Sequence, residues 1–228
     1  MYPLAQFPFS PMAHDELAYG AIYVNNKCSG TGFVLNETGQ VCTCSHVVTN
    51  KGKPLSLKDV IWFCSSDGKY SDSYELKLLW NSPDYDLALL SSEKILCQHP
   101  VQLADTFSVQ FEQTIYYVGF DEHEGVPFGH IDWVKLPPLN QLSKGIKKHT
   151  SFISSIGKCR FIGSGKDADF FDYFGECIPN YSGGCVLNGE GKAIAVNCTS
   201  WEPLKKDIQN INRNIIRAVS LEHLQQFN

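Results

Sequence analysis

The chain has 228 residues, 43% of them hydrophobic, and a formal net charge of −5. This composition excludes a disordered or low-complexity protein, and the acidic balance argues against a nucleic-acid partner, because nucleic-acid binders usually carry a basic face. No apolar run approaches the roughly 18 residues that a membrane helix needs, so we expect no membrane partner.

The N-terminal sequence and the cysteines indicate a reducing compartment. The first 16 residues lack the basic and apolar regions of a secretory signal peptide. The nine cysteines are an odd number, so they cannot all pair within one chain, and Cys42 and Cys44 have the spacing of one strand face. We therefore expect mostly reduced, buried thiols and a cytoplasmic or otherwise intracellular location.

Short β-type runs bounded by turn residues dominate the chain. They are expected, in order, at 18–24, 31–35, 40–44, 60–64, 74–80, 87–90, 113–120, 130–134, 150–153, 184–187, 193–198 and 214–219. The segments 136–148 and 162–174 are expected to be exposed loops. Ser220 has the chemistry of an N-cap for a short closing helix at 221–227.

This succession of short strands favours an all-β sandwich or barrel. No linker between two globular units is visible. The simplest organisation is two β-barrels that meet at a cleft, with the boundary near 97–108. We therefore expect a single unit of 228 residues with an N-terminal barrel at about 15–100, a C-terminal barrel at about 108–219 and a closing helix at 220–227.

Three segments carry, in chain order, the residues of a nucleophilic hydrolase. His46 stands in Cys-Ser-His-Val-Val, Asp86 in Asp-Tyr-Asp-Leu-Ala-Leu-Leu, and Ser182 in Asn-Tyr-Ser-Gly-Gly. A serine hydroxyl needs a base within hydrogen-bond reach, and histidine suits that task near neutral pH. A buried carboxylate can hold the imidazole in one tautomer. Glycines after the serine let the backbone turn tightly, so that amide groups can point at a developing oxyanion.

These motifs, together with Gly-Thr-Gly-Phe from residue 30 and Tyr-Tyr-Val-Gly-Phe from residue 116, resemble those of trypsin-like serine proteases and look closest to the HtrA (DegP) type. The resemblance spans about residues 20–225. It implies two six-stranded β-barrels with the active site between them, and a serine endopeptidase that acts on polypeptides without a cofactor. It assigns His46 as general base, Asp86 as orienting carboxylate and Ser182 as nucleophile. Asp84 is the competing carboxylate, but the family pattern has the acid directly before Leu-Ala-Leu.

The loop before Ser182 departs from the family pattern. The resemblance implies that the backbone amides of Asn180 and Ser182 form the oxyanion hole, but the family has glycine where this chain has Asn180. Asparagine tolerates the positive φ of this position better than other non-glycine residues. Tyr181 replaces the residue that makes the activation ion pair in trypsin, so we expect activity without removal of a propeptide. In the unliganded state we expect the Asn180 N–H to point away from the oxyanion position, and His46 to lie about 2.6–3.2 Å from the Ser182 hydroxyl, or slightly farther.

The same resemblance suggests where substrate binds. Val196, Asn197 and Cys198 correspond to the strand edge that pairs with an extended peptide. Glu176 lies six residues before Ser182, at the floor of the family's specificity pocket, where an acid favours Lys or Arg. The alternative is that Glu176 is a solvated loop residue.

The cysteines offer two alternative interpretations of the site, as zinc ligands or as the nucleophile. Zinc ligands could come from Cys42, Cys44, Cys177, Cys185 and Cys198. The one-residue spacing of the first two is a strand-face pattern and no Cys-x-x-Cys exists, so no metal site is expected. Cys185 is disfavoured as nucleophile because Ser182 holds the motif position.

A second function class is a catalytically silent relative that binds extended peptides through the 196–199 edge. Asn180 and Tyr181 keep this alternative open, and the intact triad argues against it. His123, His130 and His149 lie in polar stretches and are expected to be solvated. The sequence gives no indication of the oligomeric state.

Overall fold

The computed structural model describes residues 16–50, 53–56, 58–66, 71–94, 97–121, 144–159, 168–175, 180–201 and 214–227. Its strands are β1 (Tyr19–Val24), β2 (Lys27–Val34), β3 (Gln40–Thr43), β4 (Thr49–Asn50), β5 (Lys53–Pro54), β6 (Ile61–Ser66), β7 (Ser71–Ser82), β8 (Leu87–Ser91), β9 (Thr114–Phe120), β10 (Ile146–Cys159), β11 (Ala168–Gly175), β12 (Cys185–Leu187), β13 (Ala193–Trp201) and β14 (Asn214–Ser220). Three short 3-10 helices accompany them: η1 (Glu16–Ala18), η2 (Ser45–Val48) and η3 (Glu222–Phe227). None of the helices in these ranges is long and apolar enough to cross a membrane.

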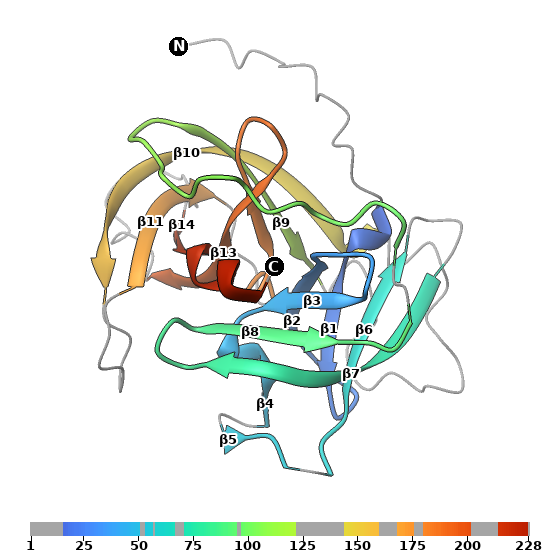
Figure 1. The fold of residues 1–228 in the computed structure, drawn as a ribbon. Helices are drawn as coiled ribbons and strands as arrows, with labels where there is room; N and C mark the ends of the chain where they lie inside the picture. Colours follow the sequence, from blue (N-terminus) through green and yellow to red (C-terminus); the bar gives the residue numbers. More distant parts are fainter. Residues whose placement is uncertain are drawn as a thin grey trace.

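All of these strands except β4 and β5, which form a separate two-stranded sheet, close into two antiparallel barrels (Figure 1). The first has the order β1-β2-β3-β8-β7-β6 and lies at the lower right of the view. The second has the order β10-β11-β14-β13-β12-β9 and lies at the upper left. The all-β double barrel with six strands in each barrel is therefore confirmed.

Each barrel encloses its own inward-facing apolar side chains, as a closed sheet requires. Ile22 and Phe33 are fully buried in the first barrel, and Ile115 and Tyr173 in the second. The β1–β2 hairpin turns through two asparagines with φ of 50° and 65°, the backbone that a tight two-residue hairpin demands.

Two segments that we expected to be loops contain strands. β10 begins at Ile146, inside the expected loop 136–148, where Ile146 pairs with Phe120 of β9. β11 occupies the second half of the expected loop 162–174. Phe171 and Tyr173 of this strand are buried in the second barrel, which is why the segment is not an exposed loop. The strand expected at 130–134 lies outside the described residues.

The acidic residue of β11 is stabilised by a partner that is distant in sequence. Asp172 is buried, and its two carboxylate oxygens accept hydrogen bonds from Arg217 of β14 at 2.8 and 2.9 Å. The Arg217 guanidinium also lies 3.8 Å from the centre of the Phe170 ring. A buried carboxylate of this kind requires such pairing, and no local sequence pattern indicates it.

The segments that connect and close the barrels run along both of them. Val101 donates its N–H to Val34 of the first barrel at 2.8 Å, and Ala104 donates to Ala193 of the second at 2.9 Å. The closing helix expected at 221–227 is the 3-10 helix η3, and Ser220 Oγ accepts from the Glu222 N–H at 3.2 Å.

Candidate active site

His46 and Asp86 form one half of the candidate site. His46 lies in η2, directly after β3, where Val47 and Val48 are buried while 48% of the His46 side chain is exposed. Asp86 ends the turn before β8 with φ 50°, a left-handed backbone that aspartate tolerates better than most residues. Its carboxylate accepts a hydrogen bond from the His46 backbone N–H at 3.0 Å and lies 2.8 Å from His46 Nδ1.

These two contacts fix both the position and the ring orientation of His46. Because the carboxylate is a pure acceptor, it favours the tautomer with the proton on Nδ1, and Nε2 then carries the lone pair. Asp84, the alternative carboxylate, lies two residues earlier in the same turn. Among the residues that the structure describes, it makes no hydrogen bond to His46.

The loop 180–184 carries Ser182 at the junction of the barrels. The left-handed backbone expected at Asn180 is confirmed, with φ 79°, and Gly183 follows with φ 86°. From β2 of the first barrel, Thr31 donates its backbone N–H to Ser182 O at 2.8 Å and its hydroxyl to Asn180 O at 2.6 Å. The first barrel therefore holds two carbonyl groups of a loop that belongs to the second.

The two glycines after Ser182 are required by close backbone approach. A Cβ on Gly183 would overlap the carbonyl oxygen of Thr31 and the hydroxyl of Thr43. A Cβ on Gly184 would overlap the carbonyl oxygen of Val118 in β9. Ser-Gly-Gly is thus the sequence that lets the loop fit between the strands of both barrels.

The Ser182 hydroxyl donates to the carbonyl oxygen of Cys198 at 3.2 Å. Within the described part of the chain no hydrogen bond joins the Ser182 hydroxyl to His46, so the expected contact of about 2.6–3.2 Å or slightly farther stays a prediction. Cys198 nonetheless connects the two halves of the site, because its Sγ lies within 4.8 Å of an Asp86 carboxylate oxygen while its carbonyl holds Ser182.

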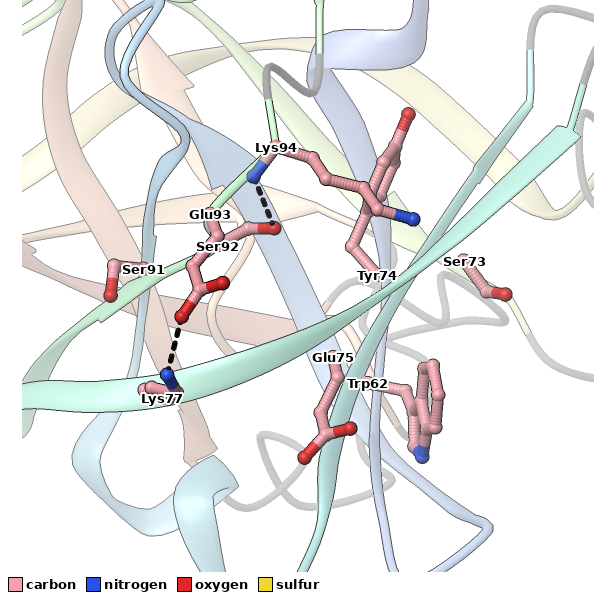
Figure 2. Close-up of a pocket in the computed structure, with 9 residues that line it drawn as sticks. All are labelled: Trp62, Ser73, Tyr74, Glu75, Lys77, Ser91, Ser92, Glu93 and Lys94. Atoms are coloured by element: carbon pink, nitrogen blue, oxygen red, sulfur yellow. Dashed lines mark hydrogen bonds and ion pairs between the residues drawn. The ribbon is translucent and has the colours of Figure 1, made fainter.

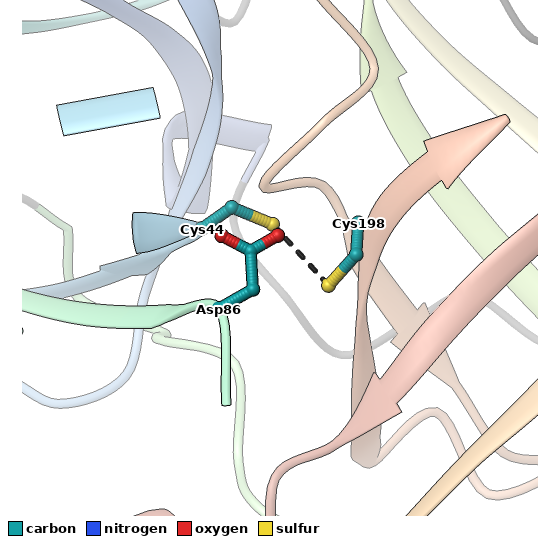
Figure 3. A group of neighbouring side chains, drawn as sticks. All are labelled: Cys44, Asp86 and Cys198. Atoms are coloured by element: carbon teal, nitrogen blue, oxygen red, sulfur yellow. Dashed lines mark hydrogen bonds between the residues drawn. The ribbon is translucent and has the colours of Figure 1, made fainter. Parts of the chain in front are cut away.

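Two thiols lie next to Asp86 at the barrel junction (Figure 3). Cys44, from the first barrel, lies with its Sγ 3.5 Å from Cys198 Sγ of β13 and 3.0 Å from the carbonyl oxygen of Asn197. Both thiols are fully buried, and burial raises the pKa of each above its ordinary value. They pack against Asp86 as neutral groups.

The same three groups are the ones in the described residues that could hold a metal ion, since their ligand atoms lie within 4.8 Å of one another. A zinc ion there would require both thiols as thiolates, against the raised pKa values. It would also compete for the Asp86 oxygens that His46 occupies. Metal binding and the His46–Asp86 contact are therefore alternatives.

Cys185, the alternative nucleophile, is fully buried at the start of β12. Burial raises the pKa of its thiol well above the ordinary value, which disfavours the thiolate that a cysteine nucleophile needs. Ser182, which directly follows Tyr181, is half-buried and therefore more accessible than Cys185.

The expected substrate-binding residues of β13 require a correction. Val196 pairs with β12 on one side and β14 on the other. Asn197 N–H and C=O both bond to the loop 180–184, each at 2.8 Å. Their backbone groups are therefore not available to a peptide, and the carbonyl of Cys198 is occupied by Ser182. Among the described strands, residues 199–201 pair with β14 alone, so the open edge begins after Cys198.

The side chain of Asn197 is also hydrogen-bonded within the second barrel. Its Oδ1 accepts a hydrogen bond from the Tyr173 hydroxyl, and its Nδ2 donates to Val118 O at 3.3 Å. These bonds brace β13 against β9 and β11 rather than presenting the amide to solvent. Glu176, expected at the specificity pocket, lies outside the described residues.

A hollow of about 390 Å³ lies on the first barrel, beside β6, β7 and the end of β8 (Figure 2). Lys77 and Glu93 form an ion pair at 2.6 Å in its wall. Its lining residues are Trp62, Ser73, Tyr74, Glu75, Lys77, Ser91, Ser92, Glu93 and Lys94. Neither His46 nor Ser182 is among them, so this hollow is separate from the candidate active site.

Two contributions to the site could not be read from the sequence. Thr31 stands in the Gly-Thr-Gly-Phe motif, but its hydroxyl bond to Asn180 joins residues that are 149 positions apart. His149 is half-buried rather than solvated, and its Nε2 lies 3.0 Å from the hydroxyl of Tyr181. The polar stretch around His149 gave no signal of this contact.

Two antiparallel barrels that hold His46, Asp86 and Ser182 around their junction define the chymotrypsin-like class of peptidase folds. The family model of the trypsin-like peptidase domain matches residues 30–196, and the chain belongs to this family. No protein with a curated description matches the sequence significantly.

Solved structures with the same fold include HtrA-type and other proteases. Deg5 has a TM-score of 0.63 at 18% identity over 92% of this chain and 87% of its own. The MamO protease domain from Magnetospirillum magneticum has a TM-score of 0.63 at 14% identity, over 93% and 96%. A variant of the HtrA-type protease AlgW with a tripeptide has a TM-score of 0.65 at 16% identity, over 94% of this chain and 60% of AlgW. At these identities the likeness is one of fold.

Proposed function

We propose that this chain is a serine endopeptidase in which Ser182 is the nucleophile, His46 the general base and Asp86 the carboxylate that orients it. The observation that carries the proposal is the double contact between Asp86 and His46, at 3.0 Å to the backbone N–H and 2.8 Å to Nδ1. A turn aspartate has no structural need to hold both groups of one half-exposed histidine. The arrangement directs Nε2 away from the carboxylate, as a general base requires.

The reaction follows from these positions. Ser182 Oγ leaves the Cys198 carbonyl and attacks the scissile carbonyl carbon while His46 Nε2 takes its proton. The oxyanion is held by the backbone N–H groups of Asn180 and Ser182, and each such donor stabilises the transition state by about 3 kcal/mol. Asp86 stabilises the imidazolium, which then protonates the leaving amine. Water hydrolyses the acyl-enzyme by the same steps.

The substrate we propose is an extended polypeptide. The edge formed by residues 199–201 has β14 as its partner on one side among the described strands, and it begins one residue after the carbonyl that holds Ser182. A peptide strand added there would reach Ser182. AlgW, which shares the fold, is known in complex with a tripeptide and a decapeptide. No cofactor takes part in this mechanism.

We also propose a reducing, intracellular compartment for the protein. The support is the odd number of cysteines, nine, and the burial of Cys44 and Cys198. Cysteines of proteins in a reducing compartment stay thiols and pack as small apolar groups.

The experiment is hydrolysis of an unfolded protein substrate by the purified chain, analysed by mass spectrometry of the fragments. We expect cleavage by the wild type and none by Ser182→Ala. The matched control is Ser92→Ala on the first barrel, where the serine is half-buried like Ser182 and the variant should cleave at the wild-type rate. Binding of the substrate without cleavage by the wild type would favour the catalytically silent peptide-binding domain instead.

A further inference from the structure

The residue directly before Ser182 is a fully buried tyrosine. Tyr181 is 1% exposed, and its ring lies against Gly119 of β9, where a side chain would leave no room for it. Its hydroxyl lies 3.0 Å from Nε2 of His149 in β10. Tyr181 is thus inserted into the second barrel and bonded there, although the trypsin-like pattern has a small or acidic residue at this position.

The histidine that meets Tyr181 is itself held in place. His149 pairs across the sheet with Tyr117 of β9, and the two rings stack with centroids 4.8 Å apart and planes 16° apart. Tyr117 is 2% exposed. The polar end of the Tyr181 ring therefore meets a fixed partner on a continuous strand, not a flexible surface group.

The backbone of Tyr181 sits between the two amides of the oxyanion hole. Its carbonyl accepts the Gly184 N–H at 3.0 Å, which closes the turn that presents Ser182. On the other side of the loop, the Thr31 hydroxyl holds the carbonyl of Asn180 at 2.6 Å. Fixing the Tyr181 side chain consequently fixes the direction of the peptide groups on both sides of it.

We propose that Tyr181 and His149 are positioning residues that hold the oxyanion loop 180–184 in its catalytic shape, so that no activation contact from a cleaved N-terminus is needed. This inference rests on the proposed peptidase function. Neither side chain touches the reacting atoms, and the pair acts through the loop backbone. The hydrogen bond from the Tyr181 hydroxyl to His149 is what positions the loop, because a phenylalanine ring would fill the same volume without that bond.

The test is Tyr181→Phe, which keeps the ring and removes the hydrogen bond. We expect kcat on a small ester to fall about tenfold with KM unchanged within about twofold, because one hydrogen bond to the loop is lost while substrate contacts remain. Hydrogen–deuterium exchange of the amides of residues 180–184 should become faster. The matched control is Tyr23→Phe, which removes an equally buried hydroxyl from the first barrel and should change neither readout.

A second pair of variants approaches the same bond from its other end. His149→Leu should reproduce the Tyr181→Phe effect, whereas His149→Gln, whose amide can still bond to the tyrosine hydroxyl, should restore most of kcat. The double variant Tyr181→Phe with His149→Leu should be no slower than either single variant, because both remove one bond.

The exchange measurement separates this inference from the proposed function. If wild-type protein has no esterase activity but Tyr181→Phe still accelerates exchange in 180–184, the loop anchor stands and the proposed function fails. If the wild type is active and Tyr181→Phe has wild-type kcat and exchange, the anchor is refuted while the proposed function stands. A fall in thermal stability with unchanged kcat and unchanged exchange at 180–184 would also refute it, because that is the result of a packing role alone.

Discussion

Gly119→Ala introduces a single methyl group behind the oxyanion loop. Its Cβ would lie 2.5 and 2.7 Å from Cδ1 and Cδ2 of Tyr181. Carbon atoms in contact are normally at least about 3.5 Å apart, so the ring has to move by about 1 Å. Gly119 is the sixth of the seven residues of β9 and pairs with Lys147 of β10, and β12 pairs with the other side of the strand at Tyr116 and Tyr117, so the backbone cannot retreat freely. The displacement therefore falls on Tyr181, and through its backbone on Ser182.

A shift of about 1 Å in a catalytic group costs about 100-fold in rate, and overpacking a core costs about 1–3 kcal/mol of stability. The assay is kcat/KM on a small ester well below the melting temperature, with urea unfolding on the same samples. Gly189→Ala is the matched control, because nothing lies within 4 Å of a Cβ at that exposed turn. A folded Gly119→Ala protein with the wild-type kcat/KM would refute the coupling between β9, Tyr181 and the nucleophile.

Four further predictions concern the loop, a buried ion pair and the thiols. Asn180→Gly removes the cost of about 1 kcal/mol that a side chain incurs at φ 79°, so the ester rate should rise, and a lower rate with the fold intact would contradict a strained loop. Asp172→Ala leaves the Arg217 charge without its buried partner and should lower the free energy of unfolding by about 3 kcal/mol in urea; a loss below about 1 kcal/mol would show that the pair is unimportant. Titration of the denatured, non-reduced protein should find at least seven thiols, and two or more disulfides would overturn the proposed compartment. Because burial raises the pKa of Cys44 above 9.0, the folded state keeps a proton that the unfolded state loses, so the free energy of unfolding should fall as pH rises above about 9, as measured by urea titration at several pH values.

The sequence predicted those strands and site residues that are indicated by patterns of neighbouring residues. Strand runs such as 87–90 and 193–198 are bounded by turn residues, and the structure has β8 and β13 there. His46 and Asp86 stand next to such strands, so their motifs could be found, and the structure joins their side chains. The positive φ at Asn180 was expected from the resemblance to the family, which has glycine at this position.

The features that the sequence did not predict depend on partners that are distant in the chain. β11 was predicted to be a loop because polar residues precede it. Its buried Asp172 is stabilised by Arg217 of β14. Val196 and Asn197 were expected at a free edge, but pairing with β12, β14 and the loop 180–184 occupies their backbone. His149 lies in a polar run, and its burial arises from Tyr117 and Tyr181 on other strands.

The hydrogen-bond acceptor of the Ser182 hydroxyl is another feature that the sequence did not predict. The order of the motifs indicates a serine near a histidine, but it cannot indicate which acceptor the hydroxyl uses in the unliganded protein. In the structure that acceptor is the Cys198 carbonyl at 3.2 Å. This choice depends on the rotation of one side chain, which a bound substrate can change.

The most direct test of the account is reaction of the purified protein with a fluorophosphonate, followed by peptide mapping of the adduct. An activated serine reacts with this reagent because a neighbouring base removes its proton, whereas an ordinary serine does not. We expect one adduct per chain, located on Ser182, absent from Ser182→Ala and formed much more slowly by His46→Ala. An unlabelled wild-type protein, or an adduct on any other residue, would contradict the assignment of Ser182 as the nucleophile.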